Sequence, residues 1–331
     1  MVYSLYIYVC RQNNMSQSSV REHEDQVERL LEEAYDLLKR RDIDLAAQRL
    51  EEALAVDFDS AEVVTSLKYV NFWRDRQATA ATITDRFEQA EYLHAQWRLF
   101  HGFVERVGNP SEKCLYAIRH HVFGQTLEHY RSLFEESGGT DAELLLRIGR
   151  CYKGMGAYDR AVHFYEQSAV SRRDDPEVLA ELADCYALVN EVQKSKAFFR
   201  EAFFVGAQRI DIAALESQMI MRLVEKVRES GYDGPALLEW VPVFGVLFGV
   251  FTVKRELRSI EYGRLKQTIY ALEREYSDAR EPDTILRARL LNRYFWLIDH
   301  YVNTNEDQSK IEEVLLKIRS LDPKVFHQYT T

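Results

Sequence analysis

Apolar, small and aromatic residues recur in a fixed order between Asp141 and Ala207. The order occurs twice, and equivalent positions such as Cys151 and Cys185 lie 34 residues apart. The other equivalent pairs are Leu145 and Leu179, Ile148 and Leu182, Gly149 and Ala183, Tyr152 and Tyr186, and Tyr165 and Phe199. Apolar residues at intervals of three and four predict helices with one buried face. A period of about 34 residues is typical of a helix–turn–helix repeat, so the stretch predicts two helical hairpins.

The first copy resembles the tetratricopeptide repeat (TPR) family. The resemblance is carried by Leu145, Ile148, Gly149, Tyr152, Gly156, Tyr158, Ala161, Tyr165 and Ala169. The second copy departs from the pattern, because Asn190, Val192 and Ser195 replace Gly156, Tyr158 and Ala161. The resemblance implies a right-handed superhelix in which the first helix of each hairpin lines a concave groove. Hairpins of this kind must stack, since none can bury its apolar face alone.

Similar spacing continues towards the N-terminus. Residues 24–58 resemble another TPR unit, with a turn at residues 40–42 and Phe58 in place of the usual proline. Residues 60–74 predict the start of a further hairpin. The helical patterns over residues 87–107 and 112–137 are interpreted as degenerate repeats or as lengthened helices that join the two TPR-like units. We therefore predict a TPR-like repeat domain over residues 20–205.

After Gly206 the helical spacing persists but the repeat is lost. Apolar positions predict helices over residues 211–229, 255–277, 281–303 and 307–320. The chain contains only 14 Gly and 6 Pro among 331 residues, which favours long helices over turns. We predict an all-α chain in which a C-terminal helical module over residues 206–331 follows the superhelix.

The module begins with an unusually apolar segment over residues 237–253. No charged residue occurs from Trp240 to Val253, and Gly245 and Gly249 have the GxxxG spacing of closely packed helices. We expect a helix buried on all sides, with Pro242 in its first turn. Two alternatives stay open: an interface that forms a homo-oligomer through residues 240–253, and membrane contact. Membrane contact is not expected, because a spanning helix needs about 20 apolar residues.

The N-terminal stretch, residues 1–19, is expected to be a disordered or mis-assigned extension. Its apolar run ends at Cys10 without a preceding basic residue, which does not fit a secretory signal. The preferred interpretation is that Met15 is the true start. A degenerate membrane or lipid anchor is the alternative.

Charge and cysteine content narrow the class of protein further. The formal net charge is −10, which argues against a general nucleic-acid binder. None of the four cysteines, Cys10, Cys114, Cys151 and Cys185, belongs to a CxxC pair. They are best interpreted as packing residues in a reducing compartment, so we expect a cytoplasmic protein.

Three sequence patterns could indicate a metal or nucleotide site, but each is weak evidence for one. Glu91-x-x-His94 is a single half of a di-iron motif, which needs two such pairs and two further glutamates. Gly154-x-Gly156 lies between predicted helices, where a repeat turn explains it better than a nucleotide loop. His120 and His121 are neighbours that a helix points in different directions. We therefore expect no enzyme activity, no metal and no cofactor.

The resemblance then suggests a function. In the TPR family the first helices expose their inner face to a partner peptide or helix, and here these positions are Leu31, Tyr35, Leu146, Arg150, Lys153 and Asp184. Glu177 and Asp184 would repel a C-terminal carboxylate, so a carboxylate clamp is excluded. We predict a non-catalytic scaffold or adaptor that binds another protein. The alternative is a carrier of a hydrophobic small molecule, lined by residues 240–253.

Overall fold

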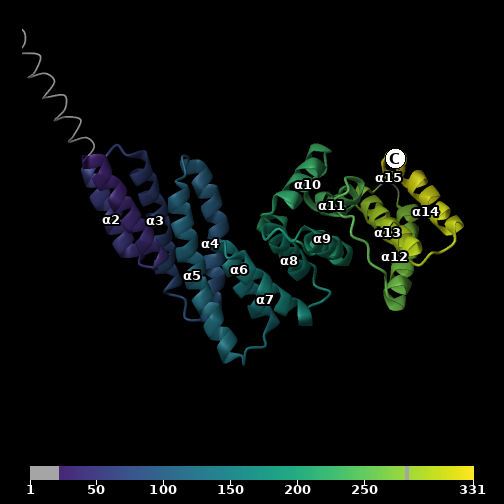
Figure 1. Ribbon diagram of the computed structural model, residues 1–331, viewed down its shortest axis with the longest axis horizontal. Helices are drawn as coiled ribbons and strands as arrows, with labels where there is room; N and C mark the ends of the chain where they lie inside the picture. Colours follow the sequence, from purple (N-terminus) through teal and green to yellow (C-terminus); the bar gives the residue numbers. More distant parts are fainter. Residues whose placement is uncertain (1–21, 280–282) are drawn as a thin grey trace, which may run out of the picture. The chain divides into compact units, whose positions relative to one another are not determined.

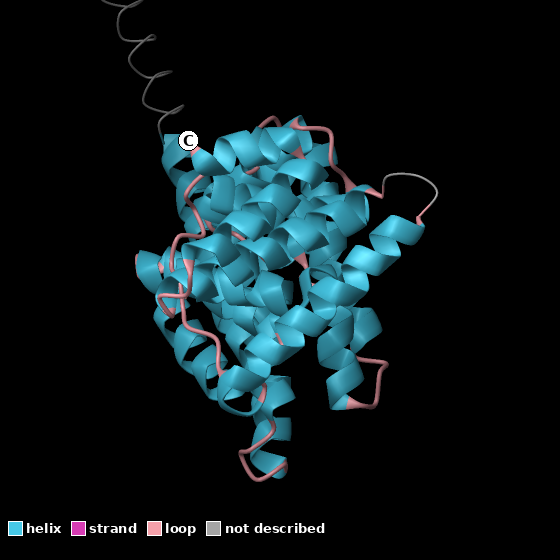
Figure 2. Ribbon diagram, turned by 90° about the vertical axis from the view of Figure 1, so that its right-hand side faces the viewer, coloured by secondary structure: helices cyan, strands magenta, loops and turns pink. Residues whose placement is uncertain are grey.

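The computed structural model describes residues 22–279 and 283–331. These residues form helices joined by turns and short extended connections, with no strand among them (Figure 2). The protein is therefore all-α, as predicted. The predictions for residues 1–19 lie outside the described part of the chain. Within the described part, no helix is both long enough and apolar enough to cross a membrane.

The chain divides into two compact units, which end and begin at Ala157 and Tyr158. The division falls in the turn of the first predicted repeat, 48 residues before the predicted domain boundary at residue 205. The reason is packing. Residues 192–206 contribute Phe199 and Phe203 to the same core as the helices that follow them.

The N-terminal unit is a series of helices that pack on their neighbours in chain order (Figure 1). Residues 22–39 are helical, and Arg41 makes the turn after them with a φ of 70°. The helices that follow are α2 (Ile43–Val56), α3 (Ala61–Ala80), α4 (Arg86–Val107), α5 (Glu112–Glu136) and α6 (Ala142–Gly154). Each of these begins after an Asp or Ser whose side chain accepts a backbone N–H of the first turn: Asp42, Ser60, Asp85, Ser111 and Asp141.

Aromatic rings fill the centre of this unit. Tyr69 and Trp73 of α3 contact Phe100 of α4 at ring distances of 5.5 and 5.4 Å. Trp97 stacks on Trp73 from the next turn of α4. The segments predicted at residues 87–107 and 112–137 are thus two long helices, α4 and α5, as the alternative of lengthened helices expected, and they share an aromatic core.

The C-terminal unit starts with the helices α7 (Tyr158–Ser171), α8 (Pro176–Leu188) and α9 (Val192–Gly206). The second predicted hairpin is present as α8 and α9, which pack against each other. The remaining helices are α10 (Gln218–Glu229), α11 (Gly234–Leu247), α12 (Ser259–Asp278), α13 (Thr284–Asn303), α14 (Gln308–Leu321) and α15 (Pro323–Thr330). Of these, α13 is the most buried and contacts α11, α12 and α14.

One predicted helix in this unit was wrong in extent, and one helix was not predicted. The helix expected at 211–229 is broken, and only a short 3-10 turn at Ile212–Ala214 precedes α10. The Asp184 carboxylate accepts the backbone N–H groups of Glu216 and Ser217, both at 2.8 Å, and holds the chain extended there. In addition, Pro323 begins the unpredicted helix α15, because a proline is tolerated in a first helical turn.

The apolar segment also differs from its prediction. Helix α11 begins at Gly234 with Pro235 in its first turn, so Pro242 lies inside the helix. It ends at Leu247, and Gly249 adopts a φ of +66° in the turn that follows. Trp240, Val241 and Val243 are buried in the core of this unit, but Phe244 is only half-buried and Phe248 is 48% exposed, so the segment is not buried on all sides.

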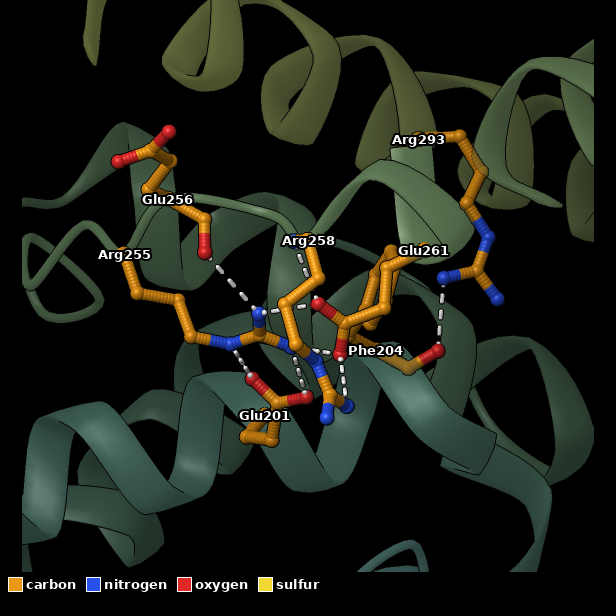
Figure 3. A network of polar contacts seen from close by, with 7 residues as sticks. All are labelled: Glu201, Phe204, Arg255, Glu256, Arg258, Glu261 and Arg293. Carbon is orange, nitrogen blue, oxygen red and sulfur yellow. Dashed lines mark hydrogen bonds and ion pairs between the residues drawn. The ribbon is translucent and has the colours of Figure 1, made fainter. Parts of the chain in front are cut away.

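A connection over residues 248–258 returns from α11 to α12 across α9. Phe251 anchors it by contacting the rings of Phe199 and Phe203. Arg255 then pairs with Glu201 at 2.7 Å and with Glu261 at 3.0 Å (Figure 3). This connection is therefore fastened at both an apolar and a charged point.

Candidate functional site

The helix formed by residues 22–39 directs one apolar face into the N-terminal unit. Val27, Leu31, Tyr35 and Leu38 are buried, at intervals of three and four residues. The Tyr35 hydroxyl donates to Glu62 Oε1 at 3.0 Å and lies 2.9 Å from Ser66 Oγ, both on α3. Burial raises the pKa of Tyr35 above its usual value, so this hydroxyl keeps its proton. Tyr35 thereby ties the first helix to α3.

An open depression of about 250 Å³ lies beside these hydrogen bonds of Tyr35. Val27, Leu31 and Tyr35 contribute its apolar part, and the first turns of α3 and α5 border it. Its remaining lining is polar and almost entirely acidic: Glu24, Glu28, Glu32, Asp57, Ser60, Glu62 and Lys113. We call this feature the acidic depression.

Charge around the acidic depression is poorly balanced. Five of its lining side chains are carboxylates, and Lys113 is its single cationic residue. Lys113 Nζ lies 3.8 Å from Glu32 Oε1, and both side chains are largely exposed. Ser111 Oγ donates to Glu62 at 2.7 Å, so part of the Glu62 carboxylate is committed within the unit. Glu24 and Glu28 stand exposed on successive turns of the first helix. The depression therefore presents negative charge over an apolar floor.

An exposed aromatic side chain adjoins the depression in the chain. Phe58 follows Asp57 in the turn between α2 and α3, and 76% of its surface is accessible. Exposed aromatic rings are enriched at contact surfaces. Phe58 is thus a candidate contact residue that the sequence prediction did not include.

The structure brings together two of the six predicted groove residues, Leu31 and Tyr35, which both line the acidic depression. Arg150 is half-buried, and the expectation of exposure was wrong for the other five residues, which are buried: Leu31, Tyr35, Leu146, Lys153 and Asp184. Leu31 and Tyr35 are themselves mostly buried and contribute the floor of the hollow rather than its rim. Asp184 serves the fold by capping the segment before α10.

The rim of the depression carried a signal in the sequence that the prediction did not use. Glu24, Glu28 and Glu32 follow one another at intervals of four, which places them on one face of a helix. The sequence could not show that Lys113 and Glu62 also line the depression, because they come from segments distant from the first helix.

The arrangements singled out for possible chemistry have structural partners. Glu91 accepts hydrogen bonds from Tyr130 and from Arg147. Gly154 packs directly against the ring of Phe123, and Gly156 has a φ of +77°, as a tight turn between two helices requires. In the described part of the chain, no three His, Cys, Asp or Glu side chains are grouped so as to hold a metal ion.

Side chains also fill the surroundings of the apolar segment proposed for a carrier. The rings of Tyr232 and Trp240 stack at 4.3 Å, and Phe244 meets both of them edge-on. Phe251 occupies the space beside Gly245. These contacts give no specific support to a ligand cavity along residues 240–253.

No family model matches the chain, and the search of curated proteins found no match. The likeness to the TPR family consequently stays a prediction that rests on the residues between Asp141 and Ala207.

Proposed function

We propose that this protein is a non-catalytic adaptor that binds a basic, amphipathic segment of a partner protein in the acidic depression. The observation that carries the proposal is the excess of carboxylates around an apolar floor formed by Val27, Leu31 and Tyr35. Lysine and arginine suit such a site, because their apolar stems cover the floor while their charged ends meet the rim. Phe58 supplies an exposed ring that a guanidinium group can stack on.

The proposal retains the predicted class of function and changes the location of the contact. The groove predicted from α6 and α8 loses support, because Leu146, Lys153 and Asp184 are buried. Cys114 and Cys151 are buried free thiols. Free thiols are typical of reducing compartments, which supports a cytoplasmic location.

The proposal is tested by titrating the full chain with a labelled peptide that alternates arginine and leucine. The double variant Glu24→Gln and Glu28→Gln should weaken binding by about fivefold, since each exposed charge pair contributes up to about 1 kcal/mol. Glu51→Gln is the matched control, because Glu51 is exposed on α2 outside the depression. Raising the salt concentration should weaken binding to the natural chain and affect the double variant less.

Equal affinity of the natural chain and the double variant would contradict the proposal. So would tighter binding of a peptide in which glutamate replaces arginine. Because the substituted residues are exposed, the variants should unfold at the same urea concentration as the natural chain, and this is checked in parallel.

A further inference from the structure

A second depression lies along the seam between α4 and α5. It has a volume of about 290 Å³, and its apolar lining consists of Trp97, Phe100, Val104, Leu115 and Tyr116. The residues from α5 lie on one face of that helix, and those from α4 face them. Arg119 adds a cation at the edge of this lining, 6.0 Å from the centre of the Trp97 ring. We call this feature the aromatic groove.

The acidic depression and the aromatic groove lie on different faces of the first turns of α5. Lys113 lines the acidic depression, whereas its neighbour Glu112 and Tyr116, one turn further on, line the aromatic groove. Half of the Tyr116 side chain is exposed, and Lys39 of the first helix lies 5.9 Å from its ring centre. The two hollows are therefore separated only by the width of one helix, about 10 Å.

We propose that one partner segment crosses the first turns of α5 and occupies both hollows. It places a lysine or arginine in the acidic depression and a bulky aromatic side chain in the aromatic groove. The inference rests on the proposed function and specifies the partner. The carboxylates select the cation, and a lining of aromatic rings favours an aromatic anchor through edge-to-face contacts. An anchor in an apolar hollow is where binding energy concentrates.

The width of α5 sets the spacing within the partner. An extended chain advances about 3.3 Å per residue, so about three residues cover the distance between the hollows. The partner segment should therefore carry its cation and its aromatic residue about three positions apart. A helical partner, which advances about 1.5 Å per residue, would need about seven.

The experiment measures fluorescence anisotropy with labelled peptides and the full chain. The first peptide carries an arginine, two Gly or Ser spacers and a tryptophan; the second carries alanine in place of the tryptophan. On the natural chain, loss of the tryptophan should weaken binding by about tenfold, the effect expected of a moderate anchor. On a Tyr116→Ser chain, that difference should shrink to about twofold.

The control is Leu99→Ser, since Leu99 is a similarly exposed apolar residue on α4, at 59% accessibility, that does not line the groove. It should keep the full tenfold difference. A set of peptides with longer spacers completes the test, and affinity should peak near three or near seven positions.

The outcomes separate the two proposals. If both peptides bind the natural chain equally, and Glu24→Gln with Glu28→Gln still weakens them, the crossing of α5 is wrong and the adaptor function stands. If Tyr116→Ser leaves the tryptophan effect unchanged, the aromatic groove is not the second contact. If neither peptide binds while the alternating arginine–leucine peptide does, the crossing of α5 is wrong and the adaptor function stands; if none of the three peptides binds, both proposals are wrong.

Discussion

The ring of Phe251 occupies the space that a side chain at position 245 would need. A Cβ atom built on Gly245 would lie closer than 3.0 Å to three ring carbons of Phe251. Because Phe251 is itself buried against Phe199 and Phe203, it has little freedom to move aside. The GxxxG spacing of this segment therefore serves two local purposes: Gly245 admits Phe251, and Gly249 takes the positive φ of the following turn.

The first prediction is that Gly245→Ala destabilises the C-terminal unit by about 1–3 kcal/mol, the usual effect of forcing extra volume into a packed core. Urea unfolding followed by circular dichroism measures the change. Gly263→Ala is the matched control. Gly263 lies inside α12 with no atom near its missing side chain, so alanine there should stabilise by about 0.5–1 kcal/mol. Equal stability of the two variants would contradict the prediction, because it would show that the Phe251 ring moves aside at little cost.

The second prediction concerns the capping role of Asp184. Removing its carboxylate leaves the N–H groups of Glu216 and Ser217 without their acceptor, and Ser217 is buried. Asp184→Ala should destabilise the fold by about 2 kcal/mol or more, because an unsatisfied buried donor costs about 1–3 kcal/mol. Asp184→Asn, which keeps one acceptor oxygen, should have a smaller effect.

Hydrogen exchange at residues 215–218 provides a local measurement for these variants, and exchange should rise there in Asp184→Ala first. Asp278→Ala is the control, since Asp278 is largely exposed at the end of α12. A uniform rise across the whole unit, without an early local change, would contradict the capping role.

The third prediction is a loss of stability in acid that depends on His121. This side chain is buried, with Nε2 at 3.1 Å from Gln77 Oε1, and burial lowers its pKa to about 4. The nearby charges, Arg41 and Asp42, act in opposite directions. Between pH 6.5 and pH 4 the unfolded chain binds a proton at His121 that the folded chain does not. Stability should therefore fall as the pH drops through this window, by on the order of 3 kcal/mol.

Urea unfolding at pH 7.5, 6 and 4.5 tests this expectation. His121→Gln should flatten the dependence, because it removes the titrating group. His23→Gln should leave the dependence unchanged, since His23 is exposed on the first helix. His120 and His129 also have pKa values lowered by burial, so a residual slope is expected in the His121 variant.

The fourth prediction concerns the connection over residues 248–258. Arg255 grips Glu201 with two nitrogens, each at 2.7 Å, and also pairs with Glu261. Arg255→Ala should raise hydrogen exchange in this connection by roughly tenfold, because its charged anchor to α9 is lost. In Arg255→Lys the exchange rate of the connection should lie between those of the natural chain and of Arg255→Ala, since a lysine keeps the charge but not the forked geometry.

Arg258→Ala serves as the comparison, because Arg258 is mostly exposed and pairs only with Glu261 among the residues drawn in Figure 3. It should leave exchange in the connection nearly unchanged. It should also raise the pKa of Glu261, which the hydrogen bond from Arg258 helps to hold at about 2. If Arg258→Ala loosens the connection as much as Arg255→Ala, the bidentate pair is not what fastens it.

The sequence alone determined the all-α class and most helix boundaries, because these depend on local signals. The starts of α2, α3, α5 and α6 follow Asp or Ser caps, and the turn at Arg41 follows from the break in apolar spacing. The acidic face of the first helix, Glu24, Glu28 and Glu32, is likewise visible in the spacing of the chain.

Only the tertiary structure decided which faces remain exposed, where α10 begins, and why Gly245 is a glycine. Each depends on a partner distant in sequence. Asp184 binds the backbone of Glu216, 32 residues away, and so interrupts the helix predicted at 211–229. Lys113 of α5 lines the acidic depression together with residues of the first helix. Helical spacing identifies a buried face, but it does not identify what covers that face. For this reason Leu146 and Asp184 could be assigned to the right helices and still be misplaced on their surface.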